Sequence, residues 1–296
     1  MEILFLGTAC MFPTKERNHS SVFVRYKNEG ILVDCGEGTQ RQLRIADIKP
    51  SKITKILISH WDGDHVLGLP GLLQSMNASE YDGKLKIYGQ KGIKNRIKKV
   101  LDAFPFDNRL DLEVIEIKKN PFFENKDFKL ESFKLEHFPA SLGFNLIEKD
   151  KRKILLSKVK KLGIPESPLL GKLQENKSIK WKGKVISPKE VTCLVKGKKI
   201  SFVSDTVLCN NIYKNVKNAD ILVTDATYTS LHEDLAKKYK HMTSKQAAQV
   251  ASKCNVSKLV LTHFSQRYKD ISEVLNEAKD IFPNTIVAHD FMKIKI

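Results

Sequence analysis

The sequence predicts an α/β fold, and three observations support this prediction. Short apolar runs typical of buried strands alternate with helix-like segments along the whole chain. Several of these runs end at His or Asp, as where Ile56-Leu57-Ile58 leads through Ser59 into His60. A chain of 296 residues can bury a sizeable core, in one large domain or two smaller ones. We expect one domain over residues 1–296 with an insertion at 148–190.

The first half of the chain reads as strands, followed by strands mixed with helices. Turn-rich segments at 7–20 and 27–30 separate the first three strands, which is typical of an antiparallel meander. Apolar periodicity then predicts helices at 40–45, 68–76 and 91–103. The expected strands are 3–6, 21–26, 31–33, 55–59, 85–89, 112–117, 128–135 and 142–147.

The second half repeats a pattern of strand, ligand-type residue and helix. Residues 191–195 and 199–203 read as a hairpin around Lys196-Gly197-Lys198. Further strands are expected at 221–224 and 258–262, and helices at 243–253 and 271–282. Three of these strands lead directly into an acidic or imidazole side chain, which are Asp205, Asp225 and His263.

The charge of the chain indicates a polyanionic partner. It has 51 Lys and Arg against 34 Asp and Glu, a net charge of +17, which favours nucleic acid. Lysine enrichment from base composition or a hot habitat is the alternative. Residues 148–190 carry 13 Lys and Arg against five Asp and Glu, with Pro165 and Pro168 fixing bends. We interpret this segment as a basic arm, although a surface loop without a partner has the same composition.

Cysteine usage and hydropathy indicate a soluble cytoplasmic protein. The five cysteines are scattered singly, without a CxxC pair, which is typical of a reducing compartment. The N-terminus reads as a strand rather than a signal peptide, and no apolar run approaches the length of a membrane span. We therefore expect no membrane association.

The segment from Ser59 to His65 concentrates candidate metal ligands. His60, Asp62, Asp64 and His65 lie within six residues. Imidazoles and carboxylates together suit zinc or manganese, and crowding them is costly unless a cation gathers them. The alternative is a polar loop in which Asp64 caps a helix.

Three more ligand-type residues follow predicted strands: His137, Asp205 and His263. Taken singly, the two histidines could belong to the core. Together with the segment above they make seven ligands, enough for two metals bridged by one carboxylate.

Ser59 to His65 resembles the HxHxDH signature of the metallo-β-lactamase fold, and the flanking motifs resemble the short-form tRNase Z (ribonuclease Z) family. The matching segments include the family's PxKxRN loop and the Gly/Pro segment of its tRNA-gripping arm. They are residues 5–8, 13–18, 34–42, 163–172, 225–228, 241–243 and 261–268. The resemblance implies an αββα sandwich, two mixed sheets with helices on the outer faces, carrying an inserted, flexible RNA-binding arm.

The resemblance also implies a metal-dependent endoribonuclease. It would remove 3′ trailers from precursor tRNA by hydroxide attack on the phosphodiester after the discriminator nucleotide, leaving a 3′ hydroxyl. Two Zn²⁺ per chain are expected, with Mn²⁺ an option, particularly at the site containing Asp62. The family's habit further implies a homodimer. The implied ligands are His60, the residue at 62 and His137 for one ion, and Asp64, His65 and His263 for the other, with Asp205 bridging.

The implied catalytic residues are Asp64, which orients or deprotonates the hydroxide, and the pair Asp225 and His241, which assists departure of the oxyanion. A helix-capping role is the alternative for His241. RNA contacts are expected from basic residues of the PxKxRN loop, the closing motif and the arm, namely Lys15, Arg17, Arg267, Lys158, Lys160, Lys161 and Lys172.

The chain departs from the family at three positions. Asp62 stands where the family has His, Asp225 stands for Glu, and Thr224 stands for the preceding His. Asp62 reaches less far and adds negative charge near the metals. Three outcomes are open: an active enzyme with altered metal preference, a slow enzyme, and an inactive RNA binder. A phosphodiesterase for small or cyclic substrates is the second enzyme hypothesis.

Overall fold

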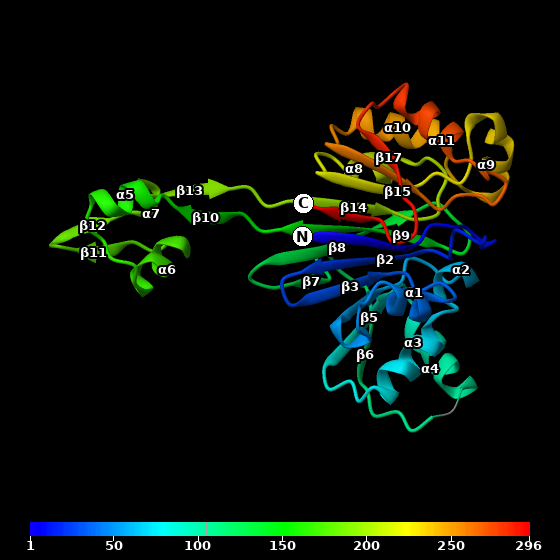
Figure 1. The fold of residues 1–296 in the computed structure, drawn as a ribbon, viewed down its shortest axis with the longest axis horizontal. Helices are drawn as coiled ribbons and strands as arrows, with labels where there is room; N and C mark the ends of the chain where they lie inside the picture. Colours follow the sequence, from blue (N-terminus) through cyan, green and yellow to red (C-terminus); the bar gives the residue numbers. More distant parts are fainter. Residues whose placement is uncertain (105) are drawn as a thin grey trace. The chain divides into compact units, whose positions relative to one another are not determined.

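Two seven-stranded sheets carry helices on their outer faces (Figure 1). The computed structural model describes residues 1–104 and 106–296. The predicted αββα sandwich is confirmed. The chain divides into two units: the larger comprises Met1–Phe123, Leu130–Leu146 and Lys199–Ile296, and the smaller Glu124–Lys129 and Ile147–Lys198.

The first sheet has the strand order β18-β1-β2-β3-β4-β5-β6. The strands β18, β1, β2 and β3 pair antiparallel, as the predicted meander requires, whereas β3 to β6 are parallel. Parallel pairing brings the carboxyl ends of β3, β4 and β5 to one edge. The strands are β1 (Glu2–Gly7), β2 (Ser21–Tyr26), β3 (Glu29–Val33), β4 (Lys55–Leu57), β5 (Lys84–Gly89), β6 (Asp111–Glu116) and β18 (Lys293–Lys295).

The second sheet has the order β17-β16-β15-β14-β9-β8-β7. Its strands β14 to β17 are parallel, so their carboxyl ends also share an edge. The strands are β7 (Phe123–Glu124), β8 (Phe128–Leu135), β9 (Ser141–Glu148), β14 (Lys199–Val203), β15 (Ile221–Asp225), β16 (Lys258–Thr262) and β17 (Thr285–Val287).

Each sheet buries one face under helices. Leu43, Leu72 and Ile97 pack with the first sheet, while Ala247, Ala251 and Val274 pack with the second. The helices of the larger unit are α1 (Thr39–Ile45), η1 (Pro50–Lys52), α2 (Gly63–Val66), α3 (Leu69–Ala78), α4 (Ile93–Ala103), α8 (Asn210–Asn215), η2 (Ser230–His232), α9 (Glu233–Tyr239), α10 (Ser244–Lys253) and α11 (Ser272–Lys279).

The smaller unit has its own apolar core, which the lysine-rich sequence did not reveal. Val159, Leu173, Ile186 and Val191 are buried together. Strand β10 pairs antiparallel with β13, and β11 with β12. The RNA-binding role and the flexibility of this segment stay predictions. Its elements are β10 (Lys151–Ile154), α5 (Leu156–Lys161), α6 (Pro168–Gln174), β11 (Ile179–Trp181), β12 (Lys184–Ile186), α7 (Pro188–Val191) and β13 (Thr192–Val195).

The predicted hairpin around Lys196-Gly197-Lys198 is wrong. Strand β13 pairs with β10, whereas β14 lies between β9 and β15. The amide of Glu148 donates to the Lys198 carbonyl at 2.8 Å, and a Cβ on Gly197 would lie 1.9 Å from the Glu148 carbonyl oxygen. The chain therefore changes sheets at this glycine. The sequence shows two apolar runs separated by three residues, but this spacing does not indicate whether the two strands pair with each other.

All five cysteines are free thiols. Among the residues that the structure describes, no helix has both the length and the apolar character that crossing a bilayer requires.

Candidate metal centre

The predicted ligands converge from the carboxyl ends of strands in both sheets. His60 follows β4, Asp205 follows β14 and His263 follows β16, while His137 follows β8. Parallel strands of one sheet end at the same edge, so residues distant in sequence meet there. Asp62 is the N-cap residue of α2, so the alternative that Asp64 caps this helix does not hold.

The first group of candidate ligands comprises His60, Asp62 and His137. The Nε2 atoms of His60 and His137 lie 3.5 and 3.4 Å from Asp62 Oδ2. His60 Nε2 also lies 3.6 Å from Oδ2 of Asp205. One oxygen of Asp205 therefore faces the first group.

The second group comprises Asp64, His65 and His263, all buried. The Nε2 atoms of His65 and His263 lie 3.5 and 3.3 Å from Asp64 Oδ2. They lie 3.4 and 3.3 Å from Oδ1 of Asp205. The other oxygen of Asp205 thus faces the second group, an arrangement that suits a bridging carboxylate.

Each of the four imidazoles in these two groups points Nε2 into the centre because its Nδ1 is hydrogen-bonded elsewhere. Such outer hydrogen bonds set the tautomer and the orientation of metal-ligating histidines. The Nδ1 partners are Ser59 Oγ for His60 (2.9 Å), Asp34 Oδ2 for His65 (2.8 Å), the Lys240 carbonyl for His137 (2.9 Å) and Thr227 Oγ1 for His263 (2.9 Å).

The second group leaves two lone pairs facing each other. His65 Nδ1 donates to the Asp34 carboxylate. The Thr227 hydroxyl donates to Asp225 Oδ1 at 2.6 Å, so it accepts from His263 Nδ1. Both Nε2 atoms are then unprotonated in the neutral rings, and they lie 3.2 Å apart. Only a proton or a cation between them relieves this repulsion.

Two buried atoms of the centre have no hydrogen-bond partner among the described residues, His60 Nε2 and Asp64 Oδ1. Orphaned buried polar atoms are rare in native proteins unless an ion or water satisfies them. Four imidazole nitrogens and three carboxylates are the donor types that zinc prefers. The residues therefore fit a divalent cation.

Charges in the centre stabilise one another. Burial alone would raise the pKa of the Asp205 carboxyl, but the imidazoles of His263, His65 and His60 hold this pKa well below its ordinary value. Burial likewise opposes ionisation of His65, but Asp205, Asp64 and Asp34 hold its pKa well above the ordinary value. The carboxylates that favour an imidazolium here equally favour a bound cation.

Asp34 is a site residue whose role the sequence did not reveal. Its Oδ2 accepts from His65 Nδ1 at 2.8 Å and from the Ser59 hydroxyl at 2.7 Å, while its Oδ1 accepts from the Ser59 amide at 2.8 Å. Gly68, the N-cap residue of α3, packs closely against the loop after β3: a Cβ on it would lie 2.1 Å from the Gly36 carbonyl oxygen, so only glycine fits there. The sequence did contain one signal for this role of Asp34: it is an acidic residue directly after the predicted strand 31–33.

Asp225 and His241 form an ion-pair contact beside the ligands. His241 Nδ1 donates to Asp225 Oδ2 at 2.9 Å, so the shorter carboxylate still reaches the imidazole. Burial would raise the pKa of Asp225, but His241 and His263 hold it far below its ordinary value. Thr243, not His241, caps α10. An ionised Asp225 therefore orients the His241 ring through this hydrogen bond.

The three remaining histidines form hydrogen bonds away from the centre. His19 Nε2 lies 3.1 Å from the Met11 carbonyl, and His232 Nδ1 lies 2.9 Å from the Tyr268 hydroxyl. His289 Nδ1 contacts the Asp290 carbonyl at 3.0 Å.

Most of the predicted RNA-binding residues are exposed. Lys15 is exposed in the PxKxRN loop, and the Arg267 guanidinium lies 5.4 Å from the centroid of the Tyr228 ring. The four arm lysines are exposed as well, and none of them forms an ion pair with a residue that the structure describes: Lys158, Lys160 and Lys161 of α5 and Lys172 of α6.

Arg17 does not fit the predicted RNA contact because it is 8 % exposed. Its Nη2 donates to the carbonyls of Tyr268 and Ser265, at 2.9 and 3.4 Å. A guanidinium that joins two loops in this way stabilises the fold. We therefore expect Arg17→Ala to lower the free energy of unfolding by about 2 kcal/mol, measured by urea denaturation. Lys15→Ala, in the same loop, should change it by less than about 0.5 kcal/mol. Equal stability of both variants would contradict the structural role of Arg17.

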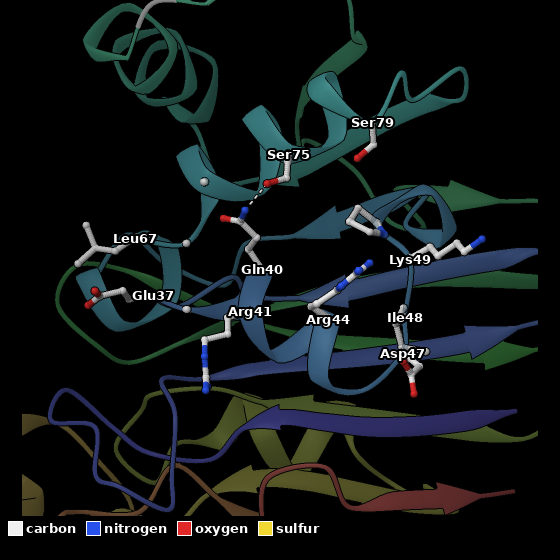
Figure 2. Close-up of a pocket in the computed structure, with 14 residues that line it drawn as sticks. Glu37, Gln40, Arg41, Arg44, Asp47, Ile48, Lys49, Leu67, Ser75 and Ser79 are labelled. Atoms are coloured by element: carbon white, nitrogen blue, oxygen red, sulfur yellow. Dashed lines mark hydrogen bonds between the residues drawn. The ribbon is translucent and has the colours of Figure 1, made fainter.

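A cavity of about 860 Å³ lies between α1 and α3, and none of the candidate ligands lines it (Figure 2). Gln40 of α1 donates a hydrogen bond to Ser75 of α3 across it, and Arg44 and Lys49 lie further along the same cavity. This cavity is separate from the candidate metal centre.

Two family profiles match consecutive parts of the chain. The profile described as anti-Pycsar protein Apyc1 matches residues 1–163, and the one described as beta-lactamase superfamily domain matches residues 174–264. The metallo-β-lactamase fold protein YhfI of Bacillus subtilis superposes with a TM-score of 0.72 at 15% identity, covering 99% of this chain and 98% of that chain. At this identity the likeness concerns the fold alone.

Proteins named ribonuclease Z match over the full length. The protein of Archaeoglobus fulgidus is 39% identical, covering 100% of this chain and 97% of its own. That of Methanothermobacter thermautotrophicus is 36% identical, with the same coverage of both chains. The short form of human tRNase Z superposes with a TM-score of 0.73 at 29% identity, covering 100% of this chain and 99% of its own. The chain therefore belongs to the ribonuclease Z family of the metallo-β-lactamase fold.

Proposed function

We propose that this protein is an endoribonuclease that removes 3′ trailers from precursor tRNA. It cuts after the discriminator nucleotide and leaves a 3′ hydroxyl on the tRNA. The observation that carries this proposal is the seven-residue centre, in which the two oxygens of Asp205 face two groups of ligand atoms. The names of the full-length relatives support the choice of substrate.

We further propose two divalent ions, zinc or manganese. His60, Asp62 and His137 would hold one, Asp64, His65 and His263 the other, and Asp205 both. When bound, such ions neutralise the charge that gathers on the phosphodiester during in-line displacement.

The residues of the chain have separate tasks in this reaction. Asp64 Oδ1, which no described residue hydrogen-bonds, accepts the proton of the attacking water. His241, held by Asp225, donates a proton to the departing 3′ oxygen of the discriminator nucleotide. The rings of His137 and His263 each lie 5.4 Å from the ring of His241, so this proton donor is adjacent to both groups.

The positive charge of the smaller unit supports the proposal that this unit binds RNA. Residues 148–190 carry a local net charge of +8. Lysine contacts to phosphates supply a sequence-independent, salt-sensitive affinity, and folded RNA is recognised mainly by its shape. The arm would thus bind tRNA while the larger unit performs the chemistry.

The direct test of this function uses a precursor tRNA that carries a 3′ trailer. The purified protein is incubated with this RNA and Zn²⁺ or Mn²⁺, and both product ends are mapped. We expect one cut after the discriminator nucleotide, with a 3′ hydroxyl on the tRNA. Cutting at scattered positions, or the absence of cutting with either ion, would contradict the proposal.

Asp62 should set the metal preference. Its carboxylate places a negative charge between His60 and His137, where the family has a neutral imidazole. We expect Asp62→His to raise the ratio of zinc-supported to manganese-supported cleavage about tenfold, because imidazole suits zinc and hard oxygen suits manganese. Metal analysis of each variant should still give two ions per chain. Asp62→Asn, which removes the charge but keeps the size, is the matched control.

If Asp62→Ala retains two ions and the wild-type metal preference, Asp62 is not a ligand. If wild-type protein retains no metal and does not cut, the protein is an RNA binder instead. A homodimer and a cytoplasmic location complete the proposal, and light scattering of the purified protein tests the dimer.

A further inference from the structure

A small cavity adjoins the first group of candidate ligands. It has a volume of about 140 Å³, and its lining includes His60, Trp61 and Gln90 together with Lys91, Ile93 and Arg96. His60 thus belongs to both the cavity and the centre. A cavity of this size suits one nucleobase rather than a length of RNA.

The aromatic wall of this cavity is fixed relative to the centre. Trp61 lies between the candidate ligands His60 and Asp62 in the chain, and its partly buried indole packs against the apolar core of the first sheet. The guanidinium of Arg96, from α4, lies 5.4 Å from the centroid of the Trp61 ring. An indole with a neighbouring guanidinium is a platform on which single-stranded bases stack.

The polar groups of the cavity are available to a ligand. Gln90 Nε2 donates to the Ser59 carbonyl at 2.8 Å and also to the Ala140 carbonyl. Two carbonyl acceptors fix the amide orientation, and no described residue hydrogen-bonds its Oε1. Lys91 and Arg96 are exposed, and neither forms an ion pair with any residue that the structure describes.

We propose that this cavity binds one unpaired nucleotide of the substrate RNA next to the scissile phosphate. Its base stacks on Trp61 and donates to Gln90 Oε1, while its phosphate lies beside Lys91 and Arg96. Unpaired bases at RNA ends are recognised through such stacking and edge contacts. This inference rests on the proposed function, because the scissile phosphate defines the neighbouring nucleotide. The competing explanation is that Trp61 only fills space under α4.

Tryptophan fluorescence tests binding without cleavage. The chain contains two tryptophans, and the second, Trp181, belongs to the smaller unit, where its indole donates to the Leu162 carbonyl. Trp181→Phe therefore leaves Trp61 as the sole reporter. The probe is a single-stranded RNA hexanucleotide. Its central linkages are methylphosphonates, which the enzyme cannot cleave, and its other linkages are phosphodiesters. We expect saturable quenching of the Trp61 emission in the metal-loaded enzyme.

Matched variants separate the cavity from general charge. Arg96→Ala should weaken binding of the hexanucleotide about tenfold. Lys94→Ala removes the same charge from α4 outside the cavity and should change binding less than about twofold. The proposal is overturned if the hexanucleotide does not alter Trp61 emission, or if both variants weaken binding equally. Either result can occur while precursor tRNA is cut normally, so it leaves the proposed function intact.

A substrate series locates the bound nucleotide. Precursor tRNAs carry one abasic residue immediately 5′ or 3′ of the cut. In wild-type enzyme, one of the two substitutions should raise KM about tenfold with little change in kcat. In the Trp61→Leu variant, the same abasic residue in the RNA should not raise KM further. In the Trp61→Phe variant, most of the KM increase caused by the abasic residue should return. If the abasic effect persists in Trp61→Leu, the base binds elsewhere and Trp61 is structural.

Discussion

Replacing Asp205 by asparagine should lower kcat/KM for cleavage of precursor tRNA by at least about 10³-fold. Asp205 is 3 % exposed and offers one oxygen to each ligand group. Asparagine keeps the shape but replaces the negative charge with an amide that has one oxygen acceptor. We expect the metal content to fall below two ions per chain, measured by mass spectrometry of the dialysed protein.

The control for this variant is Asp220→Asn, because Asp220 directly precedes β15, at the opposite end of that strand from the candidate ligands. It should keep both the metal content and the cleavage rate. Asp205→Asn that retained two ions and the wild-type rate would eliminate the bridging role. Loss of activity with full metal content would instead place Asp205 in catalysis alone.

Removal of the arm should separate binding from chemistry. Without residues 151–195, kcat/KM for precursor tRNA should fall by about 10³-fold, because the proposed contacts of the arm to phosphates would be lost. Hydrolysis of a small phosphodiester should stay within about twofold, because all candidate ligands belong to the larger unit. Steady-state kinetics with both substrates give the comparison. Equal loss of both activities in a folded variant would contradict the division of labour.

The structure determines where to cut the chain for this experiment. A deletion of 150–185, guided by sequence alone, would leave Ile186 and Val191 without their core partners. Asp150 accepts from Lys196 Nζ at 2.7 Å and from the Gly197 amide at 2.9 Å, and a two-glycine link between Asp150 and Lys196 retains both contacts. The matched control keeps the arm but changes Lys158, Lys160 and Lys161 to Ala, and should lower the salt dependence of binding.

Much of the fold was predictable because its strands are short apolar runs that end at characteristic polar residues. The strands Ser21–Tyr26 and Phe128–Leu135 have the predicted bounds. The pairing of β13 and β14 was not predictable, because apolar alternation indicates a strand but not its neighbour. The small core of the arm was hidden for a similar reason. Its few apolar residues, such as Val159 and Leu173, are spread over several short elements.

Which residues could gather at the sheet edge was predictable from the order of residues along the chain, because the ligand positions follow local strand ends. That order could not determine the outer partners of these residues. The carboxylate of Asp34 and the Thr227 hydroxyl orient imidazoles that lie 31 and 36 positions away in the chain. For Arg17 likewise, the sequence does not indicate whether the guanidinium is buried or free to contact RNA, and the fold shows that it is buried. Hydrogen bonds and burial arise from packing between segments that are distant in the chain, so they become visible once the chain is folded.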